Sequence, residues 1–234
     1  MRLTLANEKA KDNACKHWHY SKSHPLKTIG YNVFNANDEW CGVVLFGLGA
    51  MHHIGDSYNL PMGGVVELVR VALNGKQEAT SQAVAMSLKQ LKKDAPVVRL
   101  VVSYADIDQS HLGTIYQATN WIYTGETAAG TPSFIIHGKK THKRSIYDHI
   151  VIIDGKPMHC PENLENVRRF IDPKAQVVYS AGKRKYLFPL DKAMRRKILP
   201  LSKPYPKNED WAKIDRSIFK DKETINQGEK VAQT

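Results

Sequence analysis

A cluster of polar residues follows one of the apolar runs of the chain. Residues 97–102 are apolar except for Arg99, and the run ends in Ser103, Tyr104 and Asp106. In open α/β sheets, ligands bind in the crevice beyond the carboxyl ends of the strands. A hydroxyl, a phenol and a carboxylate at such an end can orient a substrate or move a proton. Asp106 is therefore our first candidate for a general base or a metal ligand.

Each of these residues also has a structural interpretation. Asp106 precedes a predicted helix, where Asp is a favoured N-cap. Ser103 is a nucleophile, a residue that orients substrate, or a hydrogen-bonding group at a strand end. Tyr104 and Tyr116 either stack on a base or belong to the core. The residues alone leave these alternatives open.

A second polar segment lies near the N-terminus, where His17, Trp18, His19 and Tyr20 are consecutive. These side chains could supply a proton shuttle, a stacking surface or ligands, although a lone histidine is more often structural. Asp106 with His19 or His111 has the ligand types of an open divalent metal site, including an Fe²⁺ site of two histidines and one carboxylate. A plain polar network is the alternative.

Local patterns predict the elements that must position these residues. Val84, Leu88 and Leu91 recur at the spacing of one helix face, while the apolar runs ending at turn residues indicate strands. The predicted strands are residues 29–34, 40–46, 65–73, 97–104, 121–124 and 133–136, with helices at 80–93 and 109–119 and a hairpin at 177–187. Glu67 and Arg70 lie three apart on one predicted strand, so we expect them on opposite faces.

The positive charge is concentrated in the C-terminal part. Residues 1–136 hold 12 Lys and Arg against 11 Asp and Glu, whereas residues 137–234 hold 22 against 12. Basic groups that neutralise phosphates, with aromatic residues between them, are typical of a nucleic-acid-binding segment. A solvated surface is the alternative. The expected phosphate contacts are Lys143, Arg144, Lys183, Arg184, Lys185, Arg195 and Arg196.

Composition excludes several classes of protein. No apolar run approaches the roughly 18 residues of a membrane span, and the N-terminus lacks the apolar core of a signal peptide. Cys15, Cys41 and Cys160 are far apart and show no CxxC spacing, which argues against a disulfide framework or a structural zinc site. We therefore expect a cytoplasmic protein that does not bind a membrane.

The order of elements in residues 29–136, and the segment Tyr116–Gly125, resemble the acetyltransferase (GNAT) superfamily. The resemblance implies an α/β or α+β fold with a mixed central sheet flanked by helices, here with a basic C-terminal extension. It also implies an acyl-CoA-like donor, whose pyrophosphate would rest at the N-terminus of the central helix. Arg70 and Ser81 are the matching cofactor-binding candidates. Residues 74–83 depart from the glycine-rich loop of that superfamily.

Several ordered motifs resemble the phage Mom family of DNA-modification proteins. They are His19–Ser23, Gly42–Ala50, Glu67–Leu73, Leu88–Lys93, Ser103–His111, Ile115–Gly125 and Lys185–Arg196. The resemblance implies that the N6 amine of adenine in DNA is converted to a carbamoylmethyl (acetamido) amine, which shields phage DNA from host restriction. The partner is then double-stranded DNA with the adenine flipped out, and the protein works in a phage-infected bacterium. Assembly into a homodimer is left open.

The candidate residues suit that chemistry. The adenine amine is a poor nucleophile because its lone pair is delocalised, so a flipped base needs a dry pocket and a positioned general base. Our hypothesis is that Asp106, His19 and Tyr20 serve the chemistry. Ser103, Tyr104 and Tyr116 then shape the pockets for adenine and donor.

We expect three segments along the chain. These are a catalytic core over residues 1–136, a basic DNA-binding extension over 137–201 and a partly disordered basic tail over 202–234. Two other functions remain as alternatives. One is an acyl-CoA N-acyltransferase acting on a small-molecule or protein amine, and the other is a non-catalytic DNA-binding protein.

Overall fold

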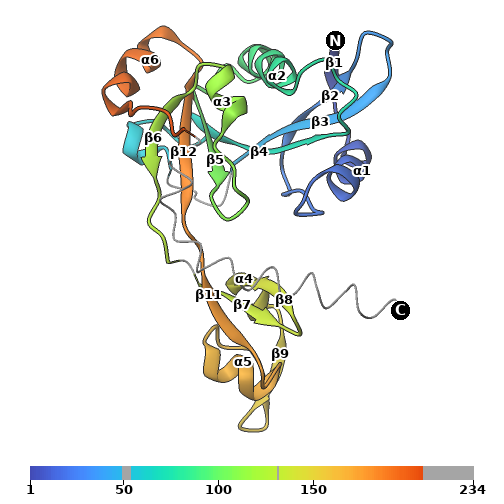
Figure 1. Ribbon diagram of the computed structural model, residues 1–234, viewed down its shortest axis with the longest axis vertical. Helices are drawn as coiled ribbons and strands as arrows, with labels where there is room; N and C mark the ends of the chain where they lie inside the picture. The colour runs from blue at the N-terminus through green and yellow to red at the C-terminus, as the bar shows by residue number, and fades with distance from the viewer. Residues whose placement is uncertain (49–53, 131, 208–234) are drawn as a thin grey trace. The chain divides into compact units, whose positions relative to one another are not determined.

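The computed structural model describes residues 1–48, 54–130 and 132–207 (Figure 1). The chain divides into two compact units. The core unit comprises Met1–Glu126 and Arg184–Tyr205, and the second unit comprises Thr127–Lys183 together with Pro206 and Lys207. No helix among the described residues is long and apolar enough to cross a membrane.

The core unit is built on a seven-stranded mixed sheet. Its order is β1 (Arg2–Leu5), β2 (Ile29–Phe34), β3 (Trp40–Gly47), β4 (Val65–Leu73), β5 (Leu100–Asp106), β12 (Lys183–Pro189) and β6 (Ile122–Glu126). Neighbours from β1 to β4 are antiparallel, β4 and β5 are parallel, and β12 and β6 are antiparallel. The observed order of β2, β3, β4, α2, β5, α3 and β6 along the chain is the order that the sequence predicted.

Helices cover the two faces of this sheet (Figure 1). They are α1 (Glu8–Trp18), α2 (Thr80–Asp94), α3 (Thr114–Ala118) and α6 (Lys192–Ile198), with short turns η1 (Asp56–Tyr58) and η2 (Leu199–Leu201). The predicted stripe of α2 is buried against Val44, Phe46 and other residues of one face. Cys15 of α1 packs on Leu45 of the opposite face. The expected fold class, a mixed central sheet flanked by helices, is confirmed.

A β-bulge in β4 changes which residues share a face of the sheet. Gly47 of β3 pairs with Glu67, Phe46 with Leu68, and Leu45 with Arg70, so the β4 residue between the last two pairs has no partner. Gly47 and Leu45 lie two apart and face the same side of β3, hence their partners Glu67 and Arg70 also share one side. Our expectation of opposite faces was wrong because it assumed uninterrupted alternation.

Strands β4 and β5 separate at their carboxyl ends. Their parallel ladder runs from the pair of Val65 and Leu100 to the pair of Glu67 and Val102, where it stops. Beyond that point β4 continues beside β3. The segment Ser103–Asp106 therefore faces a split in the sheet, which is the type of place where α/β proteins bind ligands.

Strand β12 belongs to the core sheet although it is distant in sequence from the other strands. It lies between β5 and β6, and α6 packs Met194 and Ile198 against Leu100 and Val102. The expected hairpin over residues 177–187 was wrong, since β11 and β12 belong to different sheets. Residues 184–205 thus complete the core unit, whereas we placed most of them in the basic extension.

The second unit has its own small core. It contains a sheet in the order β11 (Gln176–Tyr179), β7 (Pro132–Ile136) and β8 (Lys139–His142), a hairpin of β9 (Ile150–Ile153) and β10 (Lys156–His159), and the helices α4 (Lys143–Tyr147) and α5 (Leu164–Phe170). Phe134, Ile146, Cys160 and Val167 are buried together. All three cysteines are buried and free. The residues of the predicted tail from 208 onward lie outside the described residues.

Candidate active site

His19 ends α1 and is held by its own neighbours. Its backbone N–H donates to the Cys15 carbonyl oxygen over 3.2 Å. Its ring Nδ1 accepts the Ser21 backbone N–H over 3.1 Å and lies 2.8 Å from Ser21 Oγ. Because Nδ1 accepts, the neutral imidazole carries its proton on Nε2. Burial lowers the pKa of His19 to about 4, with further lowering by the positive charge of Arg70. His19 is therefore neutral near pH 7 and a weak base.

Tyr20 lies between two histidines. Its ring stacks on His19 with centroids 4.4 Å apart and meets the His111 ring edge-on at 6.4 Å. Partial burial raises the pKa of Tyr20, and the negative charge of Asp106 raises it further. The phenol is thus protonated at neutral pH and able to donate a hydrogen bond. The segment after α1 and the loop after β5 meet at this ring.

Arg70 joins the same segment to the bulge of β4. Its Nε donates to the Ser23 carbonyl oxygen over 2.9 Å, and its Nη1 donates to the Val69 carbonyl oxygen over 2.7 Å. Burial raises the pKa of Tyr104 to about 12, with a further contribution from the negative charge of Glu67, which lies on the same side of β4. The same charge adds to the raised pKa values of Tyr20 and Tyr116, which burial raises most. Glu67 and Arg70 therefore place one negative and one positive charge beside the tyrosines.

Ser103 and Tyr116 form a hydrogen-bonded pair inside the split. The buried Ser103 hydroxyl lies 3.0 Å from the Leu68 carbonyl oxygen and 2.8 Å from the Tyr116 hydroxyl oxygen. Since a carbonyl can only accept, Ser103 donates to Leu68 and accepts from Tyr116. Burial raises the pKa of the Tyr116 phenol. Ser103 thus bridges the two separated strands and orients Tyr116.

Asp106 is fixed by a turn rather than by a helix. Its Oδ1 accepts the Asp108 backbone N–H over 2.9 Å. Helix α3 begins only at Thr114, with Gly113 as its N-cap. The N-cap interpretation of Asp106 was therefore wrong, because the helix predicted from residue 109 starts five residues later. The turn holds one carboxylate oxygen and leaves Oδ2 without a hydrogen-bond partner among the described residues.

A pocket of about 250 Å³ lies beside these residues, lined by Tyr104, Ala105 and residues 110–116. Side chains of β12 hold its wall. Arg184 Nη1 donates to the His111 carbonyl oxygen over 3.1 Å, and the Tyr186 hydroxyl donates to the Leu112 carbonyl oxygen over 2.5 Å. Gly113 follows with φ +75°, and a Cβ there would lie 2.5 Å from the Tyr186 ring. The wall therefore depends on contacts with a strand distant in sequence.

The predicted basic residues have different surroundings. Arg184 is only 2% exposed and lies 3.3 Å from Glu126, so its side chain faces the protein and not solvent. Lys185 Nζ lies 5.3 Å from the centre of the Tyr58 ring. Arg195 and Arg196 are exposed on α6. In the second unit Lys183 is exposed and Lys143 pairs with Glu162 at 3.0 Å, while the Arg144 side chain lies outside the described residues.

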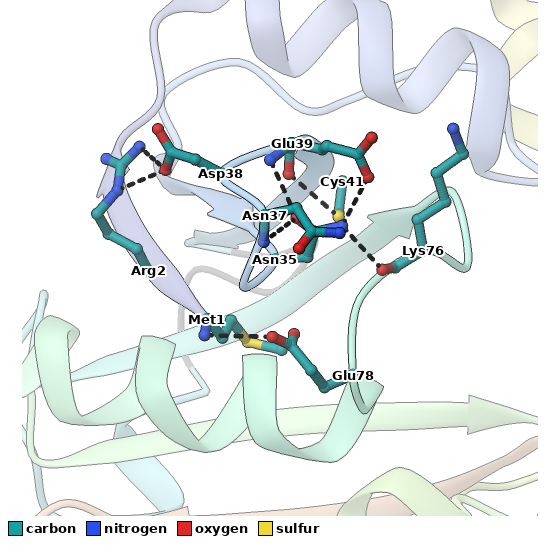
Figure 2. A network of polar contacts seen from close by, with 9 residues as sticks. All are labelled: Met1, Arg2, Asn35, Asn37, Asp38, Glu39, Cys41, Lys76 and Glu78. Carbon is teal, nitrogen blue, oxygen red and sulfur yellow. Dashed lines mark hydrogen bonds and ion pairs between the residues drawn. The ribbon is translucent and has the colours of Figure 1, made fainter.

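The start of α2 differs from a diphosphate site. Ser81 lies in the first turn, and the N-cap Ala79 makes no side-chain hydrogen bond. Glu78 next to it lies 3.3 Å from the amino group of Met1 (Figure 2), and a hydrogen bond from its own backbone N–H lowers the pKa of this carboxyl. A carboxylate beside the helix N-terminus repels phosphate groups. The residues present do not fit the pyrophosphate of CoA.

A metal centre is not supported by the arrangement either. Within residues 1–48, 54–130 and 132–207, no group of three or more His, Cys, Asp and Glu side chains is placed to hold an ion. In addition, Nδ1 of His19 already accepts a hydrogen bond from Ser21. His19 and Asp106 thus lack a third ligand of these types among the described residues.

The structure thus brings together six of the predicted residues with Arg70, but not Ser81. These six are His19, Tyr20, Ser103, Tyr104, Asp106 and Tyr116. Sequence reasoning missed that Arg184 and Tyr186 hold the pocket wall. Their alternation along β12 is the signal that could have indicated a shared, inward-facing side.

Comparisons with known proteins add the following. The model of the Mom protein family matches residues 2–207. No curated protein matches the sequence. Among solved structures, the chain is similar to a Bacillus subtilis acetyltransferase in complex with CoA, with 12% identity, a TM-score of 0.42 and coverage of 80% of this chain and 97% of that one. It is also similar to the Vibrio cholerae spermidine/spermine N-acetyltransferase SpeG in complex with manganese ions, with 8% identity, a TM-score of 0.41 and coverage of 83% and 95%.

Proposed function

The chain belongs to the Mom protein family, and from this premise we propose that it is a DNA-modifying transferase. The acceptor is the N6 amine of adenine in double-stranded DNA, and the product is an N6-carbamoylmethyl (acetamido) amine. The modification protects phage DNA from host restriction.

The observation that carries this proposal is the group of ionisable side chains at the split between β4 and β5, next to a small pocket. A volume of about 250 Å³ is below the roughly 300–1,000 Å³ of pockets for drug-sized ligands, and it suits one flipped base. Tyr104 and Tyr116 line this pocket and offer aromatic faces, on which bases stack.

Asp106 is the best-placed general base. The nitrogen bonds to the methylene carbon of a two-carbon amide donor while the bond from that carbon to the donor's leaving group breaks. The amine must lose a proton in the same step, because its lone pair is otherwise delocalised. The Asp108 N–H fixes Oδ1 of Asp106, which leaves Oδ2 to take that proton. His19 is less suited, since its pKa is about 4 and its Nδ1 is already in use.

Tyr20 and Tyr116 act as donors and not as bases in this proposal. Both phenols have raised pKa values, mainly because burial, partial for Tyr20 and nearly complete for Tyr116, disfavours the charged form. Tyr20 is 60% exposed and stacked on His19, so it can contact a base that enters from solution. Tyr116 donates to Ser103 and keeps the pocket in shape.

The test is the nucleoside composition of DNA from cells that express the chain. Digestion and mass spectrometry should reveal an adenosine heavier by a carbamoylmethyl group. Asp106→Asn should lower its amount about 100-fold or more, the usual contribution of a general base. Asp12→Asn on α1 is the matched control, since this carboxylate pairs with Lys16 at 2.7 Å and does not line the pocket, and it should leave the amount unchanged.

Two outcomes contradict the proposal. A wild-type level of the heavier nucleoside with Asp106→Asn removes this carboxylate from the chemistry. Unmodified adenosine with the wild-type chain, together with tight binding of CoA in calorimetry, would instead select an acyl-CoA N-acyltransferase.

A further inference from the structure

The hairpin of β9 and β10 in the second unit has one face turned to solvent. Its turn residues Asp154 and Gly155 have φ values of 51° and 76°, as in the tight type I′ turn of two-residue hairpins. Val151 and Ile153 pack on the core of the unit. The alternating residues Ile150 and Ile152 are 60% and 62% exposed, which is unusual for isoleucine.

Neighbouring residues extend this outer face. His159 pairs with Ile150 and Pro157 with Ile152 across the hairpin, so these four side chains share one side. The Tyr147 ring stacks on His159 at 4.1 Å with an angle of 11° between the planes, and His159 Nδ1 donates to the Tyr147 carbonyl oxygen over 2.7 Å. We call Tyr147, Ile150, Ile152, Pro157 and His159 the outer face.

The charge of the unit indicates an acidic partner. Residues 127–183 contain nine Lys and Arg against five Asp and Glu. Lys156, beside Pro157 on β10, and Lys139 on β8 are both exposed. Asp148 and Asp154 flank the hairpin, but no member of the outer face is acidic. The outer face has an apolar, aromatic centre with Lys156 beside it, in a unit of net positive charge, and it therefore complements the apolar base stack and the charged phosphates of a duplex.

We propose that the outer face of the β9–β10 hairpin inserts into a groove of double-stranded DNA, with Ile150 and Ile152 against the bases. This inference rests on the proposed function, which requires a base to leave the stack. A two-stranded ribbon fits the major groove, and apolar side chains wedged between base steps unstack them. The hairpin thereby lowers the cost of exposing the adenine.

The experiment measures binding of a fluorescent duplex by the full chain at several salt concentrations. Ile150→Ser/Ile152→Ser removes apolar area without changing charge. Affinity should fall about tenfold or more, while the slope of log K against log salt stays unchanged because no phosphate contact is lost. A duplex containing 2-aminopurine should also lose its fluorescence increase. Thermal melting checks that the variant is folded.

A second double variant serves as the control for the loss of exposed apolar area. Leu26→Ser/Met62→Ser removes two residues of the core unit that are 84% and 88% exposed, and it should bind as the wild type does. Equal affinity of the hairpin variant and the wild type overturns the inference, as does a wild-type chain that binds no duplex. A dimer that the hairpin variant dissociates, with unchanged DNA affinity, would assign the face to a second copy.

The two proposals fail separately. Modified adenine together with full DNA binding by the hairpin variant would refute only the wedge. Weakened binding by that variant, with no modified adenine from the wild type, would refute only the modification chemistry.

Discussion

Arg184 provides a sharp test, because sequence and structure assign it different roles. The sequence predicts a phosphate contact within a basic run, whereas the structure shows a side chain that is 2% exposed and donates to the His111 carbonyl oxygen over 3.1 Å. Arg184→Met keeps the apolar length and removes the charge. Arg195→Met changes an exposed arginine of α6 and is the matched control.

The expected magnitudes differ between the two variants. Each phosphate contact adds about 0.9 to the slope of log K against log salt for duplex DNA. Arg195→Met should therefore reduce the slope by about 1 if its side chain touches phosphate, while Arg184→Met should leave it unchanged.

The effect of Arg184→Met on stability should be small. The variant loses one hydrogen bond, worth about 1 kcal/mol, and the ion pair at 3.3 Å with Glu126, but it also removes a buried guanidinium whose Nε makes no hydrogen bond among the described residues. Removing one partner of an ion pair is costly where the remaining charge is buried, but the Glu126 side chain is 47% exposed and stays in contact with water. We expect the free energy of unfolding to change by less than about 1.5 kcal/mol, whereas modified adenosine should fall about tenfold or more because the pocket wall loses its anchor.

The assays are fluorescence anisotropy over a salt series, denaturant unfolding and nucleoside mass spectrometry. A reduced salt slope for Arg184→Met would refute the argument from burial and restore the phosphate contact. Unchanged modification by this variant would show that the His111 carbonyl needs no anchor.

Two further predictions concern the pocket wall and its histidine. Gly113→Ala should lower the free energy of unfolding more than Gly138→Ala does. Both glycines have φ near +75°, but only at Gly113 would an added Cβ meet a side chain, at 2.5 Å from the Tyr186 ring. Equal melting temperatures for the two variants would contradict this contact. Nuclear magnetic resonance should find that His19 titrates with a midpoint near its pKa of about 4. Since this pKa in the folded protein is below the ordinary 6.5, the contribution of His19 to stability declines as the pH falls from about 6.5 to 4. A midpoint above 6 would show that the ring is not desolvated.

Local patterns predicted those parts of the core that neighbouring residues determine. The apolar stripe of α2 and the abrupt end of the β5 run depend on residues adjacent in the chain, and both were recognised. The bulge in β4 was not, because an unpaired residue between Leu68 and Arg70 depends on the register with β3. Long-range pairing also placed Arg184 and Tyr186 at the pocket, which charge counting cannot reveal.

Pairing between β6 and β12 explains why the positive charge led us to place residues after 183 in a basic extension and not in the core unit. Arg184 pairs with Glu126 at the point where the core unit is interrupted, so the chain leaves and re-enters this unit at two residues that lie side by side. An insertion between adjacent ends leaves the host sheet intact, which is why the 57 residues Thr127–Lys183 form a unit with its own core. Basic residues on either side of the interruption then look like one continuous run in the sequence. Structurally they belong to different units: Lys183 ends the inserted unit, whereas Arg184 is buried in the core unit and supports the pocket wall.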